Sequence, residues 1–243
     1  MSPILCKAPR HILFDLDGTL LPMDMDRYIQ LYFQGLSEKL PHIAPEKVQQ
    51  MLREGIKAMM YNQSGKTNRE AFAEVFAART GMDYYGSEDA FLTFYRTGYE
   101  ACAAACQPLP LAGEIVRTLR QKGYTLTLAT SPLYPAVATQ ARMRWAGLDA
   151  RDFAFVTTFD DFHAAKPSLT YYQEVCRKLG AQPQDCLLIG NDVQEDGVAK
   201  EIGMQVIMVT DCIINKTSAP LDDFQVGTLE DVYLWARQLP QYV

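Results

Sequence analysis

From Pro108 onward the chain alternates short apolar runs with amphipathic stretches, and this alternation limits its fold more than any other feature. The apolar runs are typical of buried strands and lie at 124–130, 153–157, 185–190 and 205–209. The amphipathic stretches predict helices at 111–122, 135–146, 168–179, 194–202 and 228–238. Strands that alternate with helices favour a parallel sheet covered on both faces, and the right-handed crossover rule makes such a sheet doubly wound.

One earlier strand, 11–14, precedes a long stretch with helical patterning and no convincing strand. Helices are predicted in this stretch at about 24–40, 45–60, 68–80 and 87–106. Thr67 and Glu70 have the spacing of a capping box that opens the third of them. We therefore predict a Rossmann-like α/β core made of residues 1–22 and 107–243. An all-helical domain of residues 23–106 is inserted after its first strand.

The composition restricts what the protein can bind and where it works. The formal net charge is −6 and no cluster of Lys and Arg is present, which argues against nucleic acid as a partner. No window approaches the roughly 20 apolar residues that a membrane helix needs, and the N-terminus has no signal-peptide run. None of the six cysteines forms a CxxC pair, so we expect free thiols and a cytoplasmic, reducing location. The sequence carries no signal for an oligomeric state.

Polar residues follow the predicted strands at the edge where a doubly wound sheet binds its ligands. In chain order they are Asp15 and Asp17, Thr130 and Ser131, Lys166, Asp192, and Asp196 one helical turn later. Because the carboxyl ends of parallel strands meet at one edge, we expect four carboxylates, a hydroxyl and a lysine to converge there.

Carboxylates crowded together repel one another and resist ionisation unless a cation joins them. Mg²⁺ suits such a group, because it takes one or two carboxylates, keeps several waters and meets substrate phosphate. We predict Asp15 and Asp192 as side-chain ligands and the backbone carbonyl of Asp17 as a further one. A calcium loop of the EF-hand type would need a preceding helix and another acid before Gly18, and both are missing.

Each motif also has an ordinary structural explanation. Thr130 is then a turn hydroxyl, and Lys166 is a surface lysine ahead of a helix that starts at Pro167. Asp192 and Asp196 are then acids that the dipole of a helix favours at its N-terminus. The order of the motifs at successive strand ends favours the functional explanation.

The segments FDLDGTL, LATSP, AKPS and IGNDVQED resemble the four ordered motifs of the haloacid dehalogenase superfamily, and the helical insert resembles the cap of that superfamily. The resemblance implies that Asp15 attacks phosphorus and forms an aspartyl-phosphate. It implies that Asp17 protonates the leaving oxygen and then activates the water that hydrolyses this intermediate.

The same resemblance implies roles for the later motifs. Thr130 and Lys166 would bind the oxygens of the transferring phosphoryl group. Asp192 would complete the Mg²⁺ site, and Asp196 would hold that site or Lys166 from behind. Ser131 stands where many relatives have Asn, which bears on substrate preference rather than on activity.

Together these residues predict a Mg²⁺-dependent hydrolase of phosphate monoesters that acts on a small phosphorylated metabolite. A sugar phosphomutase would share the core and remains an alternative. A non-catalytic binding protein of the same fold would usually have lost one essential acid, and these acids are present. Asp17 argues against a dehalogenase, because true dehalogenases of the superfamily lack the second acid.

The polar segment 62–69 joins two predicted helices of the insert and is the candidate for a substrate contact. Lys66 or Arg69 would meet an anionic substrate there, while a solvated loop with Thr67 as helix cap explains the same residues equally well. The aromatic residues that follow recur at helical spacing, so we expect them in the core of the insert. They are Tyr84, Tyr85, Phe91, Phe94, Tyr95 and Tyr99.

Overall fold

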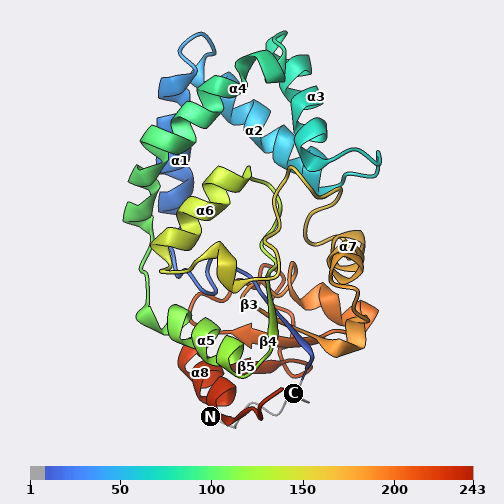
Figure 1. Ribbon diagram of the computed structural model, residues 1–243. Helices are drawn as coiled ribbons and strands as arrows, with labels where there is room; N and C mark the ends of the chain where they lie inside the picture. Colours follow the sequence, from blue (N-terminus) through green and yellow to red (C-terminus); the bar gives the residue numbers. More distant parts are fainter. Residues whose placement is uncertain (1–8, 243) are drawn as a thin grey trace.

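The computed structural model describes residues 9–242 and consists of a parallel sheet with a stack of helices at one end of it (Figure 1). Cys6 and the N-terminal segment for which no signal peptide is predicted lie outside the described residues. None of the helices within residues 9–242 is long and apolar enough to span a membrane.

The sheet has five strands in the order β2-β1-β3-β4-β5, and all neighbouring strands run parallel. The strands are β1 (His11–Phe14), β2 (Thr125–Leu128), β3 (Cys186–Gly190), β4 (Gln205–Val209) and β5 (Gln225–Gly227). The chain adds β2 on one side of β1 and β3 on the other, so the direction of winding reverses at β1. The predicted doubly wound α/β fold is confirmed, and a crevice for ligands is expected beside β1.

Helices cover both faces of the sheet because alternate strand residues point in opposite directions. Ile12 and Phe14 belong to one apolar cluster with α5 (Pro110–Gln121) and α8 (Leu229–Gln238). Leu13 belongs to a second cluster, with α7 (Leu169–Leu179) and the 3-10 helix Gly197–Ile202. In Figure 1, α5 and α8 accordingly lie on one side of the strands and α7 lies on the other.

One expectation for the sheet is wrong, and one short strand was not predicted. The predicted strand at 153–157 is reduced to a single bridge between Leu128 and Val156, although backbone hydrogen bonds still tie the segment to the edge of β2. The short 3-10 turn Ala150–Asp152 precedes it and shortens the part that can run straight. Strand β5 was not predicted, because three residues with glycine and an exposed glutamine have no apolar run.

The long stretch between β1 and β2 is helical, as predicted. Its helices are α1 (Met25–Lys39), α2 (Pro45–Met60), α3 (Asn68–Thr80) and α4 (Tyr84–Thr93), followed by a π turn, Phe94–Gly98, and a 3-10 helix, Tyr99–Ala105. The capping box of Thr67 and Glu70 is present. The helix predicted at 87–106 starts earlier, because the Asp83 carboxylate accepts from the backbone N–H of Gly86 and so caps α4.

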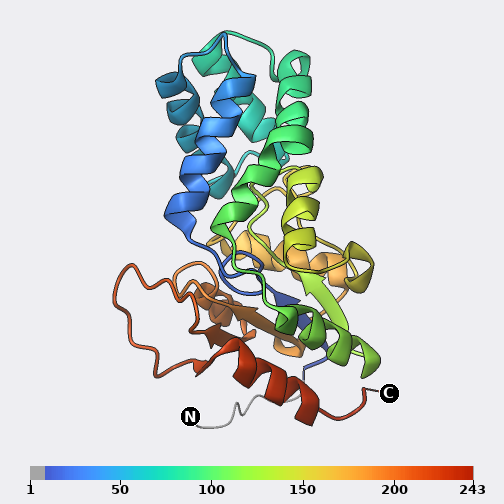
Figure 2. The same cartoon turned by 90° about the vertical axis from the view of Figure 1, so that its left-hand side faces the viewer.

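Two chain segments that lie side by side join this helical part to the sheet (Figure 2). Met23 and Cys106 form an antiparallel bridge, and the Asp24 N–H donates to the Ala105 carbonyl at 2.9 Å. The proposed domain boundaries, 22–23 and 106–107, fall in this pair of segments.

Helix α6 (Ala136–Trp145) follows β2 in the chain but lies against the helical part. Ala138 and Ala141 of α6 are buried in one apolar cluster with Tyr28, Phe94 and other residues of the insert. The helical part is therefore packed onto α6 rather than attached by its two connections alone.

Candidate active site

The first expected site residue, Asp15, lies directly after β1, at the strand where the winding reverses. Its backbone N–H donates to the Ile189 carbonyl of β3 at 2.9 Å, and its side chain is 7% exposed. The turn that follows depends on Gly18, which has a φ of +86°. A Cβ atom at Gly18 would also overlap the side chain of Asn191, so only glycine lets the two loops approach this closely.

Lys166 is fully buried between two carboxylates. Its Nζ donates to Asp15 Oδ1 at 2.7 Å and to Asp196 Oδ1 at 2.6 Å, and the side chain is 1% exposed. Burial disfavours its charge, yet Asp15 and Asp196 raise the pKa of Lys166 well above its ordinary value. The alternative of a surface lysine ahead of a proline-started helix is wrong, because α7 starts at Leu169 with Ser168 as its cap.

Asp196 organises the loop after β3 as well as Lys166. Its Oδ2 accepts from the backbone N–H groups of Asn191 and Asp192, both at 3.0 Å. Its side chain packs directly on Gly190, where a Cβ atom would overlap the carboxylate. Asp196 thereby fixes the position of Asp192 relative to Lys166.

Asp192 is 6% exposed and is held by its own loop. Its Oδ1 accepts from the backbone N–H groups of Gln194 and Glu195, both at 2.9 Å, and its Oδ2 lies 3.4 Å from the Nζ of Lys216. Burial, together with the charge of Asp192, raises the pKa of Glu195 to about 7. Carboxyl groups crowded in this region therefore resist ionisation.

The oxygen atoms of this edge suit a hard cation. Burial raises the pKa of Asp15, and the carboxylates of Asp196 and Asp17 raise it further, against the lowering by Lys166. Within residues 9–242 no group of three or more His, Cys, Asp or Glu side chains is arranged to hold a metal. A cation here would use two carboxylates, Asp15 and Asp192, with a backbone oxygen and water or phosphate, which is the ligand set that Mg²⁺ accepts.

Thr130 and Ser131 lie at the end of β2, beside β1. The carbonyl of Thr130 accepts from Thr157 Oγ1 at 2.5 Å and from the Tyr171 hydroxyl at 3.0 Å, so the loop is held in place. The Oγ of Ser131 is buried and has no hydrogen-bond partner among the described residues. That hydroxyl is available to a bound ligand.

Asp17 has a partner that the sequence analysis missed. Its Oδ2 accepts from Nη1 of Arg142, a residue of α6 that is 1% exposed. Burial raises the pKa of Asp17 although Arg142 lowers it. The available signal was the position of Arg142 on the apolar side of its helix, in register with Ala138 and Trp145.

The two predicted cap contacts are engaged elsewhere. Lys66 is exposed and forms an ion pair with Glu74. Arg69 donates from Nε to Glu88 Oε1 at 2.9 Å and lies 3.8 Å from Asp160. The structure therefore does not bring either side chain together with Asp15, and both have carboxylate partners.

Asn68, between these two residues in the same segment, joins the helical part to the sheet part. It is fully buried, and its Nδ2 donates to the carbonyls of Pro132 and Ala164, both at 3.1 Å. Its backbone N–H donates to the Phe162 carbonyl at 2.7 Å. Because Pro132 follows Ser131 and Ala164 lies two residues before Lys166, one side chain holds both ligand-binding loops.

We expect Asn68→Ala to lower the free energy of unfolding by about 1–3 kcal/mol, since it leaves two buried carbonyls without a donor. Urea denaturation measures this change. Gln63→Ala, an exposed change in the same segment, is the matched control and should stay within about 0.5 kcal/mol of the wild type. Equal stability of the two variants would rule out the joining role.

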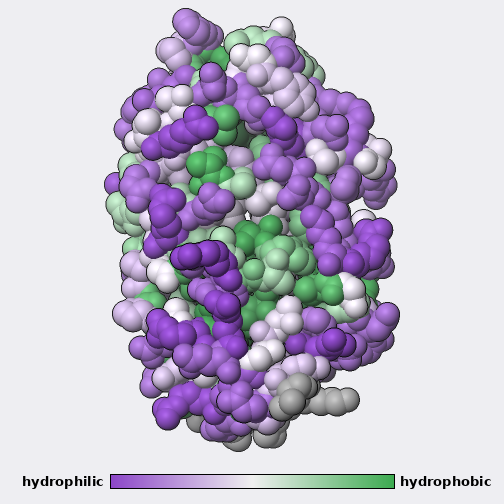
Figure 3. Space-filling model, viewed as in Figure 1, coloured by the Kyte–Doolittle hydropathy of each residue, from purple (hydrophilic) through white to green (hydrophobic). Residues whose placement is uncertain are grey.

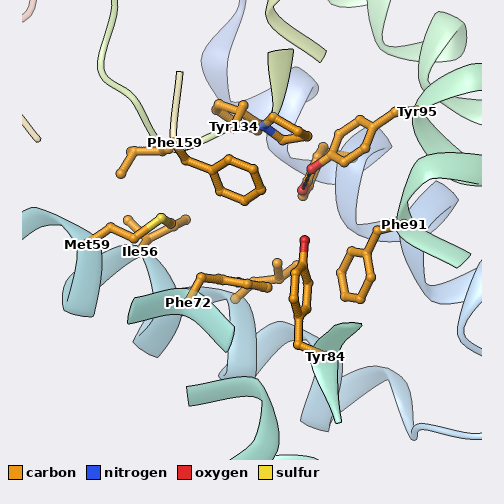
Figure 4. Close-up of a pocket in the computed structure, with 12 residues that line it drawn as sticks. Ile56, Met59, Phe72, Tyr84, Phe91, Tyr95, Tyr134 and Phe159 are labelled. Carbon is orange, nitrogen blue, oxygen red and sulfur yellow. Dashed lines mark hydrogen bonds between the residues drawn. The ribbon is translucent and has the colours of Figure 1, made fainter. Parts of the chain in front are cut away.

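An apolar cavity lies between the helical part and the loops after β2 (Figure 4). Its volume is about 30 Å³, enough for a water molecule and too small for a substrate. Aromatic rings form much of its wall, and the hydroxyls of Tyr84 and Tyr95 point into it (Figure 4). Apolar residues also gather on the surface between the helical stack and the sheet (Figure 3). With no charged residue in its lining, the cavity offers nothing to a phosphate, so the candidate site is the strand edge.

Comparisons with known proteins find similarity to hydrolases. A family model for haloacid dehalogenase-like hydrolases matches residues 9–203. A pyrophosphatase of Anoxybacillus flavithermus is 26% identical over 199 residues, 79% of each chain. A phosphoglycolate phosphatase of Agrobacterium fabrum is 24% identical over 219 residues, 90% of this chain and 87% of the relative. A hydrolase of Bacillus subtilis solved with bound magnesium shares the fold with a TM-score of 0.59 and 19% identity, over 95% of this chain and 99% of its own.

Proposed function

Because this chain belongs to the haloacid dehalogenase-like hydrolases, we propose that it hydrolyses the phosphate monoester of a small metabolite through Asp15. The observation that carries the proposal is the buried lysine at the strand edge. Lys166 Nζ lies 2.7 Å from Asp15 and 2.6 Å from Asp196, and these groups come from three separate motifs. A buried cation beside a buried carboxylate suits a site that binds a doubly charged phosphate and attacks it.

Asp15 is oriented for nucleophilic attack. Lys166 occupies its Oδ1, which leaves Oδ2, 3.3 Å from the Thr19 hydroxyl, to approach phosphorus. A new bond forms between that oxygen and phosphorus, and the bond from phosphorus to the leaving oxygen breaks. The product of this step is an aspartyl-phosphate on Asp15.

Asp17 moves the protons in both steps. In the first step its carboxyl group gives a proton to the leaving oxygen. The carboxylate formed then takes a proton from water, and that water attacks the phosphorus of the aspartyl-phosphate. Inorganic phosphate leaves and Asp15 is regenerated.

The remaining residues bind the transferring group. Lys166 and the hydroxyls of Thr130 and Ser131 would meet its oxygens, where negative charge must be stabilised in the transition state. Mg²⁺, held by Asp15, Asp192 and the Asp17 carbonyl, would supply further charge neutralisation when bound. The magnesium in the related Bacillus subtilis structure supports this choice of ion.

The alternatives to hydrolysis are weaker on the same observations. Two of the relatives are a pyrophosphatase and a phosphoglycolate phosphatase, which favours hydrolysis over a sugar phosphomutase. Asp17 argues against dehalogenation.

The described cysteines, from Cys102 to Cys212, carry free thiols, which supports a reducing, cytoplasmic location.

Phosphate release from a panel of phosphorylated metabolites and an aryl phosphate tests the proposal. We expect release with Mg²⁺, a fall of at least ~100-fold with a chelator, about 2.7 kcal/mol, and recovery when Mg²⁺ is restored. An isomerised sugar phosphate in place of inorganic phosphate would identify the mutase. Release that a chelator leaves unchanged would contradict the metal requirement.

A further inference from the structure

Arg142 is a charged side chain in a place where charge is costly. It is the largest of the fully buried side chains, at 1% exposed, and lies on α6 between the sheet and the helical part. A buried guanidinium persists only where other groups compensate for its lost hydration. Within the described residues its carboxylate partner is Asp17, so a single ion pair supplies most of that compensation.

The guanidinium is held on several sides. Nη2 donates to Thr139 Oγ1 at 3.3 Å, and the group lies 4.4 Å above the ring of Tyr134. Nη1 donates to Asp17, so three neighbouring side chains contact the guanidinium. Arg142 therefore has little freedom to turn, and the carboxylate bound to it shares that restriction.

The two oxygens of Asp17 have different surroundings. Oδ2 accepts from Arg142, whereas Oδ1 is buried and has no hydrogen-bond partner among the described residues. A buried carboxylate oxygen without a donor is costly unless a ligand completes the site. In the reaction, that free oxygen is the one able to exchange a proton with the leaving group or with water.

Resting on the proposed function, we propose that Arg142 is a positioning residue for Asp17, fixing one carboxylate oxygen so that the other transfers the proton. Arg142 itself touches neither phosphorus nor the leaving group. Proton transfer by a well-placed side chain contributes about 100-fold or more, so its loss has a characteristic pattern. Removal of Arg142 should slow only the steps in which Asp17 moves a proton.

Arg142→Met is the test, with alkyl and p-nitrophenyl phosphates as paired substrates. The alkyl leaving group needs a proton, so kcat/KM for it should fall about 100-fold, whereas kcat/KM for p-nitrophenyl phosphate should change less than ~5-fold. Asp17 also activates the water that hydrolyses the aspartyl-phosphate, so this second step should become rate-limiting in the variant. For the aryl substrate kcat and KM should then fall together. An initial burst of nitrophenol, equal in amount to the enzyme, should then appear.

Arg142→Lys and Arg144→Met complete the design. Lysine keeps the charge and should recover about a tenth of wild-type activity, with the same preference for the aryl substrate. Arg144, on the same helix and 63% exposed, pairs with Glu100, and its variant should match the wild type. If Arg142→Met does not fold by circular dichroism, the selective loss must appear in Arg142→Lys.

Equal losses on the two substrates, or an aryl reaction without a burst, would overturn the role of Arg142 while the proposed function stands. A wild type that releases phosphate from neither substrate nor any metabolite of the panel would overturn both. The wild type is therefore measured first.

Discussion

Asp15→Asn should reduce phosphate release at least ~1,000-fold, a loss of about 4 kcal/mol of transition-state stabilisation. The amide has the size of the carboxylate and its oxygen can still accept from Lys166, which lies 2.7 Å from Oδ1 in the wild type. What it lacks is a negatively charged oxygen able to form a bond to phosphorus. The measurement is kcat with saturating Mg²⁺ and a substrate that the wild type hydrolyses.

The control is Asp152→Asn, which removes a partly exposed carboxylate paired with Arg120. It should leave kcat within about twofold of the wild type, because surface ion pairs contribute little. Mass spectrometry of acid-quenched enzyme should find one phosphoryl group on Asp15 of the wild type and none on the Asn variant. If the Asn variant turned over as fast as the wild type, Asp15 would not be the nucleophile.

Lys166→Met should have the second largest effect, on stability as well as on activity. Removing the cation leaves the carboxylates of Asp15 and Asp196 buried without their shared partner, which costs about 3–5 kcal/mol. Activity should fall by at least ~100-fold, since one donor to the phosphoryl oxygens is lost. Urea denaturation with chelator present measures the first effect, and phosphate release with Mg²⁺ measures the second.

Lys66→Met is the matched control for that change. Lys66 also pairs with a carboxylate, Glu74, but both side chains are about half exposed, so water replaces the lost partner. It should unfold at nearly the wild-type urea concentration and keep its activity. Similar destabilisation by the two substitutions would show that burial of the Lys166 pair is not what makes it important.

The sequence predicts most of the fold because the signals involved are local. A continuous apolar run is enough to recognise β4, and the capping box of Thr67 places the start of α3 to the residue. The meeting of Asp15 and Asp196 follows from topology, since both lie in loops after neighbouring strands. Lys166 reaches the same edge from a segment that a single bridge, Leu128 to Val156, joins to β2. Elements with weak local signals are not predicted. Strand β5, for example, has only three residues and no hydrophobic periodicity.

Arg142 and Asn68 could not be predicted in the same way. Arg142 meets Asp17 across 125 positions in the chain, and Asn68 meets Pro132 and Ala164 across 64 and 96. The Arg142 contact exists only once α6 has packed beside the loop after β1, and the Asn68 contacts only once the helical part has docked on the loops of the sheet. The hydrophobic periodicity of a single segment does not predict how that segment will pack against another one far away in the chain.

The packing of the insert on α6 also affects the design of chimeras in which the helical insert is exchanged between enzymes of this kind. A chimera cut at the two connecting segments would transfer residues 23–106 as one block, because that is where the chain crosses. The interior of that block does not end there, since Ala138, Ala141 and Phe159 complete its apolar cluster from the other part. If residues 23–106 were transferred without these three residues, the insert would pack against an α6 whose side chains come from another protein. A chimera that keeps this apolar cluster complete must therefore transfer two separate pieces of the chain, the insert and the segment that follows β2.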